Sequence, residues 1–179
     1  MSDQAGAGPG TIHVCSLIEV PNIVRRTRAG HLVTCLADLE LSETPAGILT
    51  GRHLRLLMHD IDAEQAGFTA PNASHVADFI DFVRSWDHRT PMVIHCYAGI
   101  SRSTAAAFIA QCALNPAVPE LTIARRLRTA SASATPNRRF VSLADAALGR
   151  SGRMVQAAAD IGPGDLTSAK PFALPSRCE

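Results

Sequence analysis

The stretch that decides the fold spans residues 95–103 and reads His95-Cys96-Tyr97-Ala98-Gly99-Ile100-Ser101-Arg102-Ser103. A short apolar run, residues 91–94, leads into it, and a long apolar run follows it as far as residue 114. Short apolar runs are typical of strands buried on both faces, whereas longer ones indicate a buried helix. The order of strand, tight loop and helix therefore predicts an α/β fold, with the loop at the carboxyl end of a strand.

The loop between Cys96 and Arg102 has the length and composition to surround one tetrahedral anion. Gly99 permits backbone angles that a Cβ would forbid, so the N–H groups of residues 97–102 can point inward as an anion nest. The following helix adds the positive end of its dipole, and Arg102 adds a planar fork for two phosphoryl oxygens. This positive field favours the thiolate form of Cys96, which makes it a candidate nucleophile. Ser103 can donate a hydrogen bond to that thiolate.

The pattern His-Cys-x-x-Gly-x-x-Arg-Ser resembles the phosphate-binding loop of the cysteine-dependent protein tyrosine phosphatases. The short chain is most similar to the compact dual-specificity branch of that superfamily and its bacterial relatives. The resemblance implies that Cys96 attacks phosphorus, that Arg102 clamps the phosphate, and that an upstream aspartate acts as the general acid. The loop residues that would surround the phosphate are Tyr97, Ala98, Gly99, Ile100, Ser101 and Arg102.

Two aspartates are the main candidates for the general acid, because both follow the predicted strand over residues 54–58. A general acid must reach the leaving oxygen and then, as a base, accept a proton from water. We favour Asp60, which lies closer to the end of the apolar strand and would be held more rigidly. Asp62 is the alternative and Glu64 a third, unless all three are solvated loop carboxylates. If this strand and the strand before Cys96 are parallel, Asp60 and Cys96 emerge at the same edge of the sheet.

Other residues near the loop are expected to have structural roles. His95 is expected to hold the loop through a hydrogen bond to the backbone rather than to act as a base. Cys15 and Cys35 lie on neighbouring predicted strands and are expected in the core. A redox pairing with Cys96 stays open, because thiolates of high reactivity oxidise readily.

The composition describes an ordinary globular chain of 179 residues, with a formal net charge of +1 at pH 7. The small charge excludes a strong general attraction to nucleic acid or membrane surfaces. Five cysteines without regular spacing argue against a disulfide framework and indicate a reducing compartment. No apolar stretch reaches the ~20 residues that span a bilayer, and residues 1–10 lack the features of a signal peptide. A cytoplasmic location is therefore expected, and the many arginines and alanines favour a bacterial source.

Apolar periodicity and turn residues predict four strands and five helices. The strands are expected over residues 11–17, 31–36, 54–58 and 92–94. The helices are expected over residues 72–86, 102–114, 119–129, 136–149 and 153–161. The phrase Pro136-Asn137-Arg138-Arg139-Phe140, at the start of the fourth helix, is similar to one in a helix of compact dual-specificity phosphatases.

This order of elements predicts an α/β fold with a mainly parallel central sheet of about four to five strands, flanked by helices. Residues 1–10 are expected to form a flexible tail. Residues 11–150 would form the phosphatase domain, and residues 151–179 a C-terminal helix followed by a loosely ordered tail.

The hypothesis is a phosphomonoester hydrolase that acts through a phosphocysteine, either strict for phosphotyrosine or dual-specific. Its expected partner is a phosphorylated protein or peptide, with no nucleic acid or membrane. No metal or other cofactor is expected, because the loop and Arg102 supply the positive field. Two alternatives stay open: a phosphatase-like module that binds phosphate without hydrolysis, and a phosphatase of a non-protein phosphomonoester such as a phosphoinositide. Rhodanese-type sulfurtransferases fit less well, since their loop usually differs in length.

Overall fold

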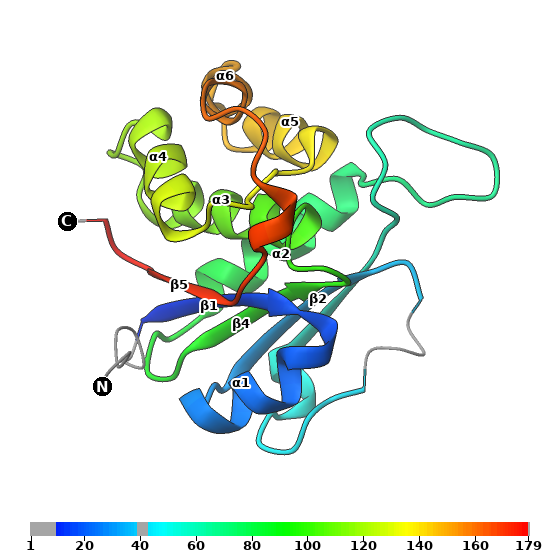
Figure 1. The fold of residues 1–179 in the computed structure, drawn as a ribbon, viewed down its shortest axis with the longest axis vertical. Helices are drawn as coiled ribbons and strands as arrows, with labels where there is room; N and C mark the ends of the chain where they lie inside the picture. The colour runs from blue at the N-terminus through cyan, green and yellow to red at the C-terminus, as the bar shows by residue number, and fades with distance from the viewer. Residues whose placement is uncertain (1–9, 39–42, 179) are drawn as a thin grey trace.

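The computed structural model describes residues 10–38 and 43–178, which form a five-stranded sheet with helices on both faces (Figure 1). The strands are β1 (Thr11–Ser16), β2 (His31–Leu36), β3 (His53–Leu57), β4 (Met92–Cys96) and β5 (Phe172–Pro175). Their order in the sheet is β3-β2-β4-β1-β5. The first four strands are parallel, and β5 pairs antiparallel with β1. The expectation of a mainly parallel sheet is confirmed.

The described part of the chain forms six α-helices, which lie on the two faces of the sheet (Figure 1). They are α1 (Val20–Thr27), α2 (Ala73–Ser85), α3 (Arg102–Leu114), α4 (Glu120–Ala130), α5 (Arg138–Ala147) and α6 (Arg153–Asp160). Short 3₁₀ helices precede α1 (η1, Leu17–Glu19), precede β3 (η3, Thr50–Arg52) and precede β5 (η4, Leu166–Ser168). The five helices expected from the sequence are confirmed, with ends that differ by no more than two residues. No helix was predicted where α1 lies.

The two faces of the sheet have separate apolar cores, because side chains alternate along each strand. Figure 1 shows α1 on one face and α2–α6 on the other. Ile12 and Ile94 face α2 and α3, whereas Cys15 and Val93 belong to the core beside α1. Helix α3 is buried from Arg102 through Cys112, which explains why its sequence is apolar almost all round.

The C-terminal segment differs from the loosely ordered tail that the sequence predicted. Residues 172–175 form β5, which pairs with β1 in the register Ile12–Leu174. Leu174 is buried because it joins the core beside α3, and Pro175 is tolerated because β5 is an edge strand. Beyond β5, Asn115 holds the chain through Nδ2–H to the carbonyl of Ser176, at 2.9 Å.

Buried ionic contacts attach α6 to the rest of the molecule. The Glu120 carboxylate accepts from Arg150 Nη1 at 3.0 Å and from Arg153 Nε at 3.1 Å. Arg150 also donates to the backbone carbonyl of Cys112 at 2.7 Å. These contacts join the starts of α4 and α6 to the end of α3. Among the described residues, no helix is long and apolar enough to cross a membrane.

Candidate active site

Cys96 is the last residue of β4, where the chain turns into the loop of residues 97–101 before α3. Its side chain is buried, and its Sγ lies 3.1 Å from Ser103 Oγ, in the first turn of α3. The strand and the helix thus hold the thiol and the hydroxyl from opposite ends of the loop. Ser103 is itself fully buried, so its hydroxyl has a fixed neighbour in Cys96.

Gly99 lets the loop lie directly against the end of β1. Its φ is +76°, in the left-handed region, and a Cβ built there would lie 2.9 Å from the carbonyl carbon of Cys15. No other residue type fits such a position without moving backbone atoms. The loop is also tied to η1, directly after β1, by the N–H of Leu17, which donates to the carbonyl of Tyr97 at 3.2 Å.

Arg102 is buried at the first position of α3, with its guanidinium group fixed on one side only. Its Nη1 donates to the backbone carbonyl of Met58 at 2.9 Å. Its Nε is buried and has no hydrogen-bond partner among the described residues; the nearest acidic oxygen, Asp60 Oδ2, lies at 4.0 Å. Burying a guanidinium N–H without a hydrogen-bond partner costs free energy. An oxygen of an anion held by the loop would accept a hydrogen bond from this Nε.

Asp60 lies against this loop, and its carboxylate is held by two neutral donors. Oδ1 accepts from Ser101 Oγ at 2.7 Å and from Asn137 Nδ2 at 2.9 Å. The side chain is 40% exposed, so it lies at the mouth of the site rather than inside the core. β3 and β4 are parallel to β2 on either side of it, which brings the segments after them to one edge of the sheet.

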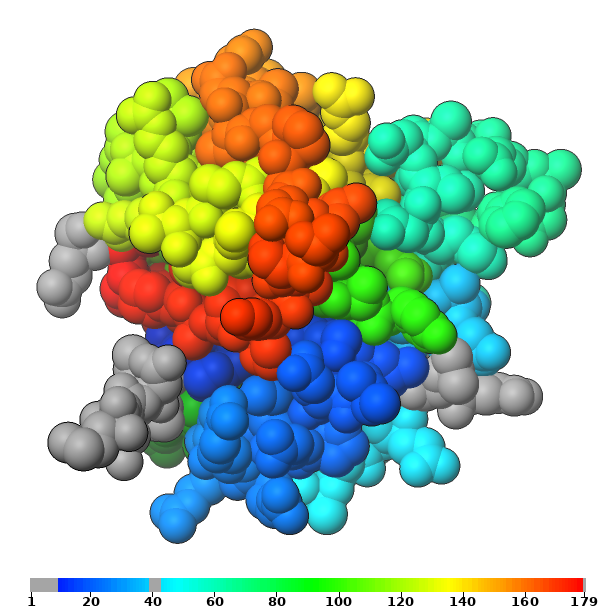
Figure 2. All heavy atoms as spheres, in the orientation of Figure 1, coloured from blue at the N-terminus to red at the C-terminus, as the bar shows by residue number. Residues whose placement is uncertain are grey.

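The other two acidic candidates lie elsewhere on the segment between β3 and α2, which projects from the body of the molecule (Figures 1 and 2). Glu64 is exposed and pairs with Arg139 Nη2 at 2.9 Å. Asp62 lines a surface hollow together with Arg138 and Arg139. Of the three carboxylates, Asp60 is the one with contacts to the loop and to Arg102.

His95 belongs to a chain of buried hydrogen bonds that crosses the sheet. Its Nε2 lies 2.7 Å from Thr34 Oγ1, which lies 2.8 Å from His53 Nε2. On the far side, His53 Nδ1 lies 2.8 Å from Thr44 Oγ1. Burial lowers the pKa of His95 from 6.5 to about 4, and the positive charge of Arg102 acts in the same direction. A threonine side chain is thus one partner of His95, and a backbone hydrogen bond with Cys96, the kind of contact that was expected, opposes the fall in the pKa of His95.

The other cysteines near the site are buried thiols. Cys15 points to the core beside α1, and Cys35 shares the core that contains Cys96. Burial raises the pKa of Cys15 to about 12, and it raises the pKa of the Cys35 thiol as well. Both are therefore protonated at neutral pH, and both lie in the core as expected, but β4 separates their strands β1 and β2 in the sheet.

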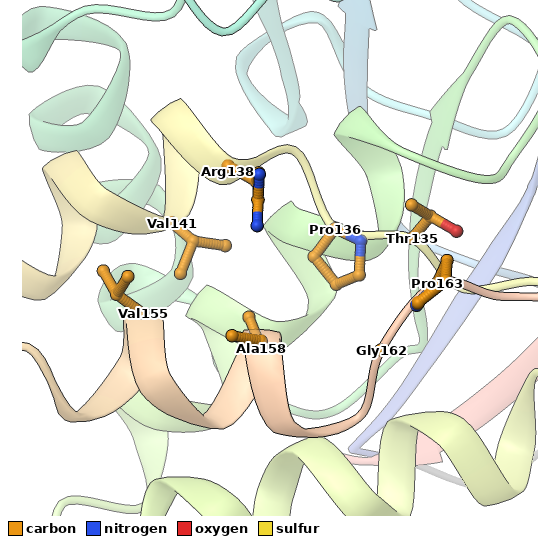
Figure 3. Close-up of a pocket in the computed structure, with 9 residues that line it drawn as sticks. Thr135, Pro136, Arg138, Val141, Val155, Ala158, Gly162 and Pro163 are labelled. Carbon is orange, nitrogen blue, oxygen red and sulfur yellow. The ribbon is translucent and has the colours of Figure 1, made fainter.

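Two hollows are lined in part by residues that contact the loop, Leu17 in one and Thr135 in the other, and Cys96 lines neither of them. The first, of about 890 Å³, is lined by η1, α1, residues 43–46 and His95. The other, of about 510 Å³, lies between α5 and α6 (Figure 3). Its wall includes Thr135 and Pro136, which lead into Asn137, and its rim carries Arg138. The side chain of Tyr97 is 66% exposed at the mouth of the loop.

Asn137 is the site residue that the sequence analysis did not assign a role. The Pro-Asn-x-x-Phe phrase marked it as the start of a helix, and it does cap α5, since its Oδ1 accepts from the N–H of Phe140 at 2.9 Å. Its contact with Asp60 joins residues 77 positions apart. No local pattern reveals a contact at such a separation.

Comparison with known proteins adds independent information. Residues 64–133 match the sequence profile of the protein-tyrosine phosphatase family. No curated protein sequence matches the chain. Its structure is similar to that of a variant of human DUSP28, with a TM-score of 0.61 at 17% identity, over 82% of this chain and 96% of that one.

Two further structures have the same fold. The Cydia pomonella PTP-2 phosphatase has a TM-score of 0.59 at 19% identity, over 75% of this chain and 84% of that one. PTPMT1, solved in complex with PI(5)P, has a TM-score of 0.56 at 13% identity, over 85% and 92%. The matched segment contains the whole anion loop, and the fold around it is that of compact phosphatases. The segment that holds the loop is thus similar to the protein-tyrosine phosphatase family, and the fold of the whole chain is similar to that of compact phosphatases.

Proposed function

We propose that the protein hydrolyses phosphomonoesters through a phosphocysteine intermediate, with phosphotyrosine in proteins or peptides as its substrate. The observation that carries this proposal is the convergence of three groups at one edge of the sheet. They are the Cys96 thiol beside Ser103, the buried Arg102 Nε without a partner, and the Asp60 carboxyl group 4.0 Å from it.

In the first step, the phosphate of the substrate lies in the loop of residues 97–101, against Arg102. The Cys96 thiolate attacks phosphorus in line, so that a P–S bond forms as the bond from phosphorus to the ester oxygen breaks. Loop N–H groups and the guanidinium group stabilise the charge on the equatorial oxygens. Asp60, in its acid form, gives its proton to the leaving oxygen, and the alcohol or phenol departs.

In the second step, water replaces the leaving group. The Asp60 carboxylate takes a proton from the water as its oxygen attacks phosphorus, and the P–S bond breaks. Inorganic phosphate leaves, and the sulfur becomes a thiolate again. Ser103 Oγ, 3.1 Å from Sγ, donates a hydrogen bond to the departing thiolate.

The loop composition favours a substrate with one phosphate. Between Cys96 and Arg102 it holds Tyr97, Ala98, Gly99, Ile100 and Ser101, so it offers no lysine or arginine to a second phosphate. An inositol phosphate would need such a charge nearby. A phosphoinositide, suggested by the likeness to PTPMT1 in complex with PI(5)P, is for this reason the second candidate.

The test is hydrolysis of para-nitrophenyl phosphate and of a phosphotyrosyl peptide, both in the presence of EDTA. We expect turnover by the wild type and none by Cys96→Ser, which should still bind inorganic phosphate. Cys178→Ser is the matched control, because that cysteine lies in the C-terminal segment, and it should keep wild-type activity. Full activity in Cys96→Ser would overturn the mechanism. A wild type that binds phosphate without turnover would indicate a phosphate-binding module instead.

A further inference from the structure

We propose that Asn137 and Ser101 are positioning residues, which together fix the Asp60 carboxyl group so that its proton is carried on Oδ2, the oxygen facing Arg102. The inference rests on the proposed function, because it concerns the proton that leaves with the substrate's ester oxygen. The inference assigns a role to two residues other than Cys96, Arg102 and Asp60, which carry the proposed chemistry.

Both neutral donors bind the same carboxylate oxygen. Ser101 Oγ lies 2.7 Å from Asp60 Oδ1, and Asn137 Nδ2 lies 2.9 Å from the same atom. An oxygen that accepts two hydrogen bonds has both lone-pair positions occupied, so it is a poor site for a proton. The proton of the acid form therefore sits on Oδ2, the oxygen 4.0 Å from Arg102 Nε.

The direction of the Asn137 amide is set by the helix it caps. Its Oδ1 accepts from the N–H of Phe140 at 2.9 Å, and only the carbonyl oxygen of the amide can do this. The Nδ2 group must then point to Asp60, where it can only donate. The side chain is 4% exposed, so it has little freedom to turn away.

The segment that carries Asn137 is attached to the anion loop itself. The N–H of Thr135 donates to the carbonyl of Ile100 at 3.0 Å, and the N–H of Asn137 donates to the carbonyl of Ser101 at 3.3 Å. The distance between the acid and the phosphate site is thus defined by short contacts. The start of α5 contacts both the loop and Asp60, so it fixes the distance between the acid and the phosphate site.

The same helix start holds the far end of the segment that carries Asp60. Arg139 Nε donates to the carbonyl of Pro71 at 2.7 Å, and its Nη2 pairs with Glu64. Asn137 also reaches the carbonyl of Ile61, at 3.5 Å. The long segment between β3 and α2 is therefore fastened to α5 at both of its ends. Proton transfer depends steeply on the position of the donor, so this fastening matters for catalysis.

The experiment compares aryl phosphates whose leaving phenols differ in acidity. In Asn137→Ser the serine still caps α5 but cannot reach Asp60. We expect kcat/KM to fall at least about tenfold for phenyl phosphate, whose leaving group needs the proton, and to change less than about twofold for para-nitrophenyl phosphate. Ser101→Ala should likewise lower kcat/KM more for phenyl phosphate than for para-nitrophenyl phosphate, and Ser101→Thr, which keeps the hydroxyl, should restore the wild-type ratio of the two.

Asn72→Ser is the matched control, because Asn72 caps α2 in the same way through Oδ1 and has no contact with Asp60. It should leave the leaving-group dependence unchanged. The measured quantity is the dependence of kcat/KM on the acidity of the leaving phenol. The positioning role is overturned if Asn137→Ser and Ser101→Ala keep the wild-type dependence while Asp60→Asn makes the dependence steeper. It is also overturned if all three variants keep the wild-type dependence. Failure of the proposed function would look different, since activity would then survive in Cys96→Ser.

Discussion

His95 precedes Cys96, the proposed nucleophile, and is neutral in the folded protein at physiological pH. Burial is the main reason that its pKa falls to about 4, and Arg102 opposes a second positive charge nearby. The Nε2 of His95 takes part in the hydrogen-bond chain through Thr34 to His53, whose own pKa burial lowers to about 4. A neutral His95 therefore leaves the positive charge of the site to Arg102 and the loop.

This neutrality predicts how stability depends on pH. In the unfolded chain His95 takes up a proton below its ordinary pKa of 6.5, whereas in the folded protein it resists until about pH 4. The stabilisation from neutral His95 is complete above pH 6.5 and is lost as the pH falls towards 4. The loss is on the order of 3 kcal/mol, since each unit of pKa is worth about 1.4 kcal/mol.

Urea unfolding between pH 7.5 and pH 4 measures the effect. The free energy of unfolding should fall less steeply with decreasing pH in His95→Asn than in the wild type. It should fall less steeply still when His53→Asn is added. Equal slopes in the wild type and in both variants would show that neither histidine is held neutral by the fold.

The elements that the sequence predicted best are those with strong local signals. β2 and α3 begin and end as expected, because β2 is an unbroken buried run and α3 ends at Asn115, before Pro116. α1 was missed because its apolar face is short and lies among arginines. β5 was missed because its four residues lie in a segment rich in proline and glycine, and their partner is at the other end of the chain.

The contribution of β5 to the free energy of unfolding should come mainly from Leu174, the one side chain that this strand buries. Leu174→Ala is expected to lower the free energy of unfolding by about 2–3 kcal/mol, because it leaves a cavity in the core beside α3. Leu166→Ala, in η4, is the control: that side chain is 61% exposed, so the change should stay within about 0.5 kcal/mol. Equal, small losses in both variants would mean that β5 is not part of the stable sheet.

The site is a property of the whole molecule, because three distant parts of the chain build it. The segment after β3 supplies Asp60, the loop after β4 supplies Cys96 and Arg102, and the start of α5 supplies Asn137. The parallel strands bring the segment after β3 and the loop after β4 to the same edge of the sheet, and this could be expected from the sequence. The position of Asn137 could not be expected, because nothing in the local pattern of α5 reveals which loop its first turn will contact.

The charge of the molecule supports the same account. A formal net charge of +1 gives no strong overall field for an anionic substrate. Under the proposed function, the attraction for phosphate would be local, and it would come from the buried Arg102 guanidinium and the start of α3. The proposed site thus suits one phosphate group rather than a polyanion.

The most direct test is to trap the phosphoryl group on the enzyme. Asp60→Asn should be mixed with para-nitrophenyl phosphate, denatured rapidly at neutral pH, digested, and analysed by mass spectrometry. This substrate needs little help to release its phenol, whereas hydrolysis of the intermediate loses its base, so the intermediate should accumulate. The account predicts one phosphoryl group on the peptide that contains Cys96, and none in the same experiment with Cys96→Ser. Turnover by the wild type with no phosphoryl group on Cys96, or with the group on another residue, would contradict it.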